Sequence, residues 1–182
     1  MAHEIANQMR AMGYEEDNVV ILACQQWWRE ESKISIPIII EESNEYPVAT
    51  KVWNLLREAG LSEVCAAAII GNMMAECGGQ TLNLNPYIYS YGYYGLCMWS
   101  LYYFPEINGL DVDGQVSYLL ETLDSNMRIG LGSAQEFFEI ENVELAARYF
   151  SDKYERPASW SSVRAENAVK ALQYFTTGSI YD

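Results

Sequence analysis

The chain has 182 residues, a length that suits one domain with a short extra arm, and half of the residues are hydrophobic. No apolar run approaches the roughly 20 residues of a membrane helix, so we expect no membrane span. The formal net charge of −14 argues against nucleic acid and anionic membranes as partners.

The first 47 residues differ in character from the rest. Residues 4–12 and 17–31 have helical spacing of apolar positions, and residues 32–47 hold Pro37 and then a polar stretch typical of a linker. We therefore expect a short N-terminal helical arm with its linker over residues 1–47 and a second domain over residues 48–182.

The second domain begins with two predicted helices. The first covers residues 50–59 and ends at Gly60. The second has Ser62 as its N-cap, an apolar run over residues 63–75 and Glu76 in its last turn. This second helix is almost entirely apolar, so it is expected to be buried. Gly78 and Gly79 follow it and end it.

Glu76 is an acid in the last turn of this apolar helix. The helix dipole is negative at that end, and the neighbours Met73, Met74 and Ala75 would desolvate a charge there. Both effects favour the protonated carboxyl, which suits a general acid near neutral pH. The alternative is an ordinary glutamate with its carboxylate in water at a helix end.

The loop after Gly79 is rich in asparagine and tyrosine. Sugar-binding clefts use aromatic rings to cover C–H faces and amides to bind hydroxyl groups, whereas tyrosines can also simply pack on a core. As a group, we interpret these residues as one wall of a cleft: Asn85, Tyr87, Tyr89, Tyr91, Tyr93 and Tyr94.

The remaining pattern predicts further helices. They are expected at residues 92–100, 114–123, 143–154 and 160–175, with a turn at residues 111–114, a loop at residues 126–133 and a stop at Pro157. The predicted fold class is all-α, with seven to nine helices.

The sequence does not indicate a metal site or a catalytic cysteine. Its one histidine is His3, and no pair of the four cysteines has CxxC spacing, so we expect no metal and no cofactor. A cysteine hydrolase using Cys77 lacks a histidine to activate the thiol. A reaction would therefore depend on carboxylates, amides and hydroxyl groups.

Six blocks in order resemble the lysozyme-like domain of phage tail proteins and of cell-wall hydrolases of conjugative elements. The resemblance covers residues 48–175, outside the first 47 residues. The blocks are VWNLLREAGLS, AAIIGNMMAECGG, NLNP, YGYYGLCMWS, GQVSYLLETL and KYERPASWSSVRAENA.

This resemblance implies a lysozyme-like helical domain that cleaves the β-1,4 bond between N-acetylmuramic acid and N-acetylglucosamine in peptidoglycan. The family's glutamate falls on Glu76, which would be the general acid. Substrate-binding positions would be Asn72, Asn85, Tyr89, Tyr91, Tyr94, Cys97, Met98 and Trp99. The implied setting is a phage tail or similar particle, virion-associated or extracellular, with glycan strands and other tail proteins as partners.

Three positions depart from the family pattern. Cys77 replaces a serine, Cys97 an alanine and Met98 a glutamine. Hydrolysis by water and attack by the muramyl 6-hydroxyl, as in a lytic transglycosylase, both fit a single acid. The alternative is a catalytically degenerate domain that binds glycan or has a structural role.

Two side-chain pairs follow from the resemblance. Glu155 and Arg164 lie in blocks that recur together, and a buried glutamate needs a partner, so we expect them to pair. Cys77 and Cys97 would border the acid and face each other. They would form either a disulfide or two separate buried thiols.

Overall fold

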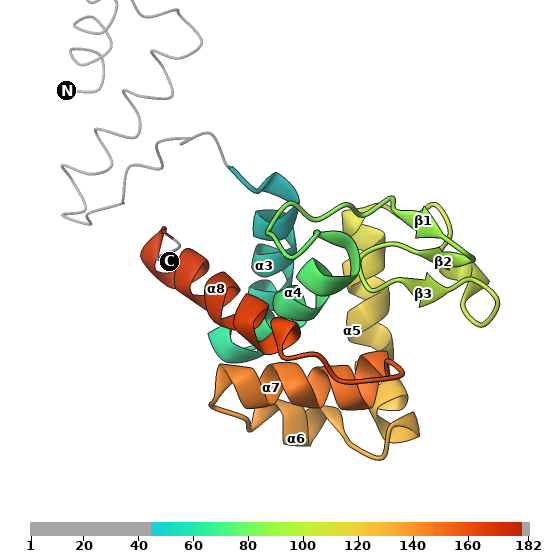
Figure 1. The fold of residues 1–182 in the computed structure, drawn as a ribbon. Coiled ribbons are helices and arrows are strands. Elements are labelled where there is room, and N and C mark those ends of the chain that lie inside the picture. The colour runs from blue at the N-terminus through green and yellow to red at the C-terminus, as the bar shows by residue number, and fades with distance from the viewer. Residues whose placement is uncertain (1–44, 180–182) are drawn as a thin grey trace, which may run out of the picture. The chain divides into compact units, whose positions relative to one another are not determined.

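Helix α4 (Glu63–Cys77) is the centre of the fold in the computed structural model, which describes residues 45–179 (Figure 1). Eleven of its 15 residues are buried, including Ile69, Ile70 and Met73. It packs against α3 (Pro47–Glu58), α7 (Val143–Phe150) and α8 (Val163–Thr177). A helix that is apolar on every face requires such surrounding elements.

The ends of α4 form as the sequence predicts. The side chain of Ser62 accepts a hydrogen bond from the Cys65 amide at 3.1 Å, and Gly78 is the C-terminal cap. The last turn extends to Cys77, so Glu76 lies inside the helix. The predicted position of Glu76 in the final turn is confirmed.

The predicted helix at residues 92–100 is wrong. This stretch contributes β2 (Tyr93–Tyr94) and β3 (Trp99–Ser100), which form an antiparallel sheet with β1 (Tyr89–Ser90) in the order β1-β2-β3. Left-handed φ angles at Gly92, Gly95 and Met98, of 84°, 80° and 46°, are incompatible with a continuous right-handed helix.

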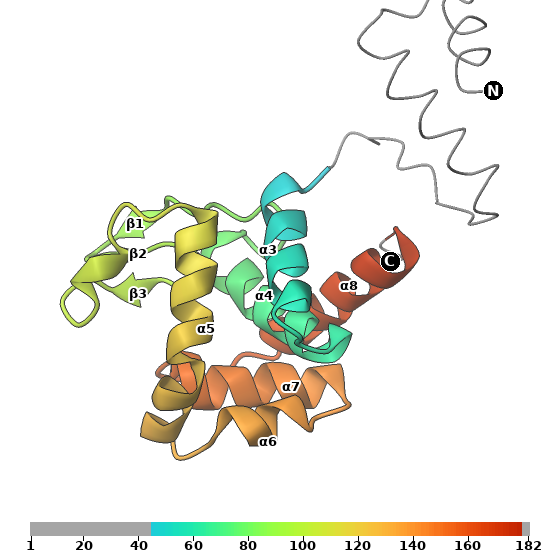
Figure 2. The same cartoon turned by 180° about the vertical axis from the view of Figure 1, so that it is seen from behind.

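Helix α5 (Val112–Ile129) is longer than the predicted 114–123 and runs beside the small sheet (Figure 2). The predicted turn at residues 111–114 is instead its N-terminus, where the Asp111 side chain accepts a hydrogen bond from the Gly114 amide at 3.0 Å. A 3-10 helix, η1 (Pro105–Ile107), precedes it. Part of the predicted loop at residues 126–133 is therefore helical.

The C-terminal part of the domain differs from the predicted helices at several points. A short helix that the sequence did not predict, α6 (Ala134–Phe138), lies beside α7, and α7 changes at Ser151 into a π-helical turn, η2 (Ser151–Glu155). Arg156 ends this turn with a left-handed φ of 52°. Helix α8 then begins at Val163 rather than at residue 160.

The predominance of helices confirms the all-α prediction. Residues 45–179 form six α-helices, two short irregular helices and one three-stranded sheet of two-residue strands. They lie in one compact unit, Asn44–Asp182. Within the described part of the chain, no helix combines the length and hydropathy that crossing a bilayer requires.

The predictions for residues 4–12, 17–31 and most of 32–47 lie outside the described residues. The division at residues 47 and 48 stays a prediction.

Gly71 permits the close crossing of α4 and α8. A Cβ atom at this position would lie 2.5 Å from the Cα atom of Ala168 and 2.7 Å from its Cβ atom. Because the neighbour is helix backbone, the clash can be relieved only by moving α8.

We predict that Gly71→Ala destabilises the domain by about 1–3 kcal/mol, despite the better helix propensity of alanine. Chemical denaturation measures the change. Gly114→Ala in α5 is the matched control, because its Cβ would meet side-chain atoms and no backbone, namely Leu110 at 3.2 Å and Asp111 Oδ1 at 3.5 Å. Equal stability of Gly71→Ala and wild type would contradict the close crossing.

Candidate active site

Glu76 forms an ion pair with Arg164, from the first turn of α8. The pair is partly shielded from water, with 23% of the Glu76 side chain and 9% of the Arg164 side chain exposed. The guanidinium also donates a hydrogen bond to Asn72 Oδ1 at 2.9 Å. Arg164 is therefore held at two points on α4, one turn apart.

Asn72, which accepts the hydrogen bond from Arg164, is fully buried. Its amide group donates hydrogen bonds to the carbonyl oxygens of Ala68 at 2.9 Å and Ala147 at 3.0 Å. With its Oδ1 accepting from Arg164, the side chain is committed to the protein. Asn72 thus orients the ion pair and is not exposed to a substrate.

The predicted pairing of Glu155 with Arg164 is wrong. Arg164 instead bonds to Glu76, because the close approach of α4 and α8 places its guanidinium against α4. Glu155 Oε1 is buried and has no hydrogen-bond partner. The sequence correctly indicated a glutamate and an arginine at one site, but it assigned the wrong glutamate to the arginine.

The environment of Glu155 favours its neutral form. Burial, followed by repulsion from the Glu76 carboxylate, raises the pKa of Glu155 to about 8, although Arg164, a hydrogen bond with the Cys97 thiol and Arg156 oppose this shift. The site therefore favours the carboxylic acid form of Glu155 over its carboxylate. Sequence reasoning had considered it only as a partner for an arginine.

A pocket of about 180 Å³ opens beside Glu155. We call it the Trp99 pocket. Its lining combines aromatic rings, sulfur atoms and a few polar groups: Tyr93, Cys97, Met98, Trp99, Ser100, Tyr103, Phe104, Asn126, Tyr154, Glu155 and Arg156. Rings with a carboxyl group are what a site for an uncharged polar ligand such as a sugar requires.

Trp99 is a fixed part of this pocket. The ring is buried, and its Nε1 donates a hydrogen bond to the Tyr154 hydroxyl at 3.2 Å. Cys97 and Met98 line the same pocket. Three of the predicted binding positions thus come together.

The tyrosines of the loop divide into three groups. Tyr93 lines the Trp99 pocket, whereas Tyr94 is only 7% exposed and belongs to the core. Tyr89 and Tyr91 are exposed, Tyr91 at 97%, outside the pocket lining. Each interpretation of the tyrosines therefore applies to some of them.

Asn85 and the following loop are held at the end of α4. The backbone N–H of Asn85 donates a hydrogen bond to the Cys77 carbonyl oxygen at 3.3 Å. The side-chain Oδ1 of Asn85 accepts one from the backbone N–H of Tyr87 at 3.0 Å. The Asn85 residue itself is exposed. It shapes the loop as an Asx turn, an arrangement typical of asparagine before proline.

Cys77 and Cys97 are buried free thiols. Of the two alternatives, the structure has separate thiols and no disulfide. Burial raises the pKa of Cys77 to about 12 and that of Cys97 well above its usual value. Neither is a ready thiolate nucleophile.

Gln115 is a structural residue that sequence reasoning missed. It is fully buried, accepts a hydrogen bond from the Leu96 amide at 2.8 Å, and donates to the Pro86 and Leu110 carbonyls, each at 2.7 Å. It thereby connects α5 to the loop on both sides of the small sheet. Its place in the GQVSYLL block was the available signal.

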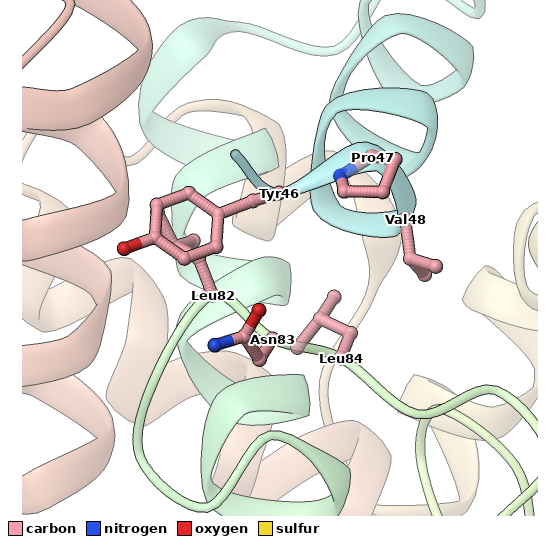
Figure 3. A pocket seen from close by; sticks show the side chains of 6 residues that line it. All are labelled: Tyr46, Pro47, Val48, Leu82, Asn83 and Leu84. Carbon is pink, nitrogen blue, oxygen red and sulfur yellow. The ribbon is translucent and has the colours of Figure 1, made fainter. Parts of the chain in front are cut away.

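A second pocket, of about 130 Å³, lies where the start of α3 meets the loop after α4 (Figure 3). Its lining includes Pro47, Val48, Leu82 and Leu84, with Tyr46 and Asn83 at its sides. It contains no carboxyl group, cysteine or histidine. The chemistry-bearing side chains gather at the Trp99 pocket instead.

No group of three or more His, Cys, Asp or Glu side chains within residues 45–179 is arranged to hold a metal ion.

A family profile described as phage tail lysozyme matches residues 47–175. The chain belongs to the phage tail lysozyme family. Membership makes this a lysozyme-like domain of a family that acts on peptidoglycan, with glycosidase chemistry as the family's type of activity. A search of curated proteins finds no match to the chain.

We predict that the stability of this phage tail lysozyme domain falls as pH rises from about 4.5 to about 8 because of Glu155. In that range the unfolded chain has released this proton and the folded chain still holds it, so the folded state is favoured at the lower pH. Glu155→Gln should remove this contribution and flatten the dependence. Thermal unfolding across the range measures it.

Glu121→Gln, at an exposed position of α5, is the control and should keep the wild-type slope. An identical slope in Glu155→Gln would contradict a buried neutral Glu155.

We predict that Gln115→Leu destabilises the domain by about 2–4 kcal/mol, because one amide and two carbonyl groups lose a buried partner. Gln135→Leu on the exposed face of α6 should change stability by less than about 0.5 kcal/mol. Urea denaturation of both variants measures the difference.

Proposed function

We propose that this domain cleaves the β-1,4 bond between N-acetylmuramic acid and N-acetylglucosamine in peptidoglycan, with Glu76 as the general acid. The observation that carries the proposal is the interaction of the Glu76–Arg164 ion pair with Glu155, which lines the aromatic Trp99 pocket, although Glu76 and Arg164 are not among the lining residues of that pocket. It joins proton-donating groups to a surface suited to sugar rings, in a member of the phage tail lysozyme family.

The glycan would lie along the small sheet. Tyr93 and Tyr103 line the pocket, and the exposed rings of Tyr89 and Tyr91 stand beyond it. Exposed tyrosines supply rigid apolar faces with a polar tip, which suits a chain of linked sugars. Asn85, Cys97, Met98 and Trp99 complete the proposed contact surface, and Tyr94 supports it from the core.

The proposed chemistry begins with proton transfer from Glu76 to the glycosidic oxygen. The carbon–oxygen bond breaks, and the sugar cation is captured either by water or by the muramyl 6-hydroxyl group. The first route makes the domain a muramidase and the second a lytic transglycosylase. We place this activity in a phage tail or a similar particle acting on the bacterial wall, virion-associated or extracellular, with other tail proteins as possible neighbours in the assembly.

The second candidate is a degenerate module that binds glycan or has a structural role. It is favoured by the sulfur side chains of Cys77 and Met98, which offer only weak hydrogen bonds at positions where the family pattern has Ser and Gln.

We predict that Glu76→Gln lowers the release of muropeptides from purified sacculi by at least about 100-fold, the usual contribution of a general acid. The amide keeps an oxygen that can accept from Arg164, so the fold should persist. Mass spectrometry of the products measures the release. Glu121→Gln should retain full activity.

The products separate the candidates. Reducing-end products indicate hydrolysis, and anhydro-sugars indicate transglycosylation. Sacculi that bind the wild-type domain without any product support the degenerate module. Full activity in Glu76→Gln would overturn the assignment of the acid.

A further inference from the structure

Glu155 has a position that the proposed role of Glu76 does not explain. It lies at the end of the η2 turn and lines the Trp99 pocket, yet its Oε1 is buried without a hydrogen-bond partner. An unpaired buried carboxylate oxygen is costly, whereas a neutral carboxyl group tolerates such a place. Its charge state therefore depends on the groups around it.

Titratable or charged groups interact with Glu155 from three neighbouring segments of the chain and from η2 itself, which contributes Tyr154. Helix α4 contributes Glu76 and Cys77, the β2–β3 turn contributes Cys97, and α8 contributes Arg164. Arg156 follows in the chain, but its guanidinium donates hydrogen bonds to two backbone carbonyls, at 2.8 and 3.0 Å.

Two carboxyl groups thus compete for one closely bound cation. Arg164 is bonded to Glu76 and Asn72, and no ion pair joins Glu155 to an arginine or lysine among residues 45–179. When one of two neighbouring carboxyl groups is bonded to a cation and the other is not, repulsion between them favours the protonated form of the unbonded one.

We propose that Glu155 is a second functional carboxyl group of this site, which lines the glycan pocket as a neutral acid and shares one proton with Glu76. The inference rests on the proposed function and adds a residue to it. Glu155 acts through Glu76, as the neighbouring carboxyl group from which the general acid receives a proton.

The proton balance is complete with these groups. The shared proton passes from Glu155 to Glu76 and then to the glycosidic oxygen, which keeps the electron pair of the breaking bond. Both carboxylates then face the positive charge on the sugar ring and stabilise it, while Arg164 balances one of them. The attacking water or 6-hydroxyl group releases a proton, which returns to the pair.

The test compares the pH dependence of muropeptide release for wild type, Glu155→Gln and Glu121→Gln. Glu155→Gln should lose activity at neutral and alkaline pH and regain it at acid pH, where solvent supplies the proton in place of Glu155. Its alkaline limb should move down by at least one pH unit, equivalent to about tenfold lower activity at a fixed pH on that limb. Glu121→Gln should follow wild type.

A residue with only a structural role would lower activity by the same factor at every pH. That result, or an unshifted alkaline limb in an active Glu155→Gln enzyme, overturns the inference and leaves Glu76 as the acid. A wild-type domain that releases nothing at any pH overturns the proposed function and the role of Glu155 with it.

Infrared difference spectra give a readout independent of catalysis. Wild type at pH 7 should show the carbonyl stretch of a protonated carboxyl group, and Glu155→Gln should lack it. In Glu76→Gln, the pH at which this band disappears should change. It should fall if the loss of repulsion from the Glu76 carboxylate dominates, and it should rise if the amide leaves Arg164 further from Glu155. A change in either direction shows that the two side chains are coupled. Absence of the band in wild type, or no shift in Glu76→Gln, overturns the shared proton.

Discussion

The contact between α4 and α8 at Gly71 is the constraint on which the site depends. Without a side chain at Gly71, the backbone of α8 approaches α4 at Ala168, and this crossing places Arg164 beside Glu76 and Asn72. Asn72 then anchors the arginine through carbonyl oxygens of α4 and α7. The packing of α4, α7 and α8 therefore holds the Arg164 guanidinium and the Glu76 side chain in position.

The sequence specified the buried helix and its acid well. A continuous apolar stretch, a Ser62 cap and terminal glycines are local signals, and each formed as expected. The turn at residues 92–100 was not predictable in the same way, because its left-handed residues include Tyr91 and Met98, which do not signal that conformation. Periodicity alone favoured a helix there.

The sequence indicated that Arg164 belongs to the site, but it did not indicate which glutamate the arginine binds. Glu76 and Glu155 are 79 residues apart in the sequence and both approach the arginine in space, so only the helix crossing decides which one bonds to it. Likewise, the burial of Tyr94 and the exposure of Tyr91 depend on the register of two-residue strands. Such short strands leave no readable alternation in the sequence.

The Met98 side chain affects Glu155 as well as the proposed sugar site. Met98 lines the pocket with Glu155, and its thioether provides little solvation for a carboxylate. Methionine at a position where the family pattern has glutamine therefore removes hydrogen bonds to a sugar and also favours a neutral acid. This one substitution affects sugar binding and acidity in opposite directions.

The π-helical turn Ser151–Glu155 sets the rotational phase of the last residues after α7. A regular α-helix advances by about 100° per residue, so the wider turn changes the direction in which Glu155 leaves the helix axis. One residue of helix length is thus enough to turn this carboxyl group toward the pocket or away from it. Acidity in this fold is adjustable by insertion or deletion, without exchanging any residue of the pocket itself.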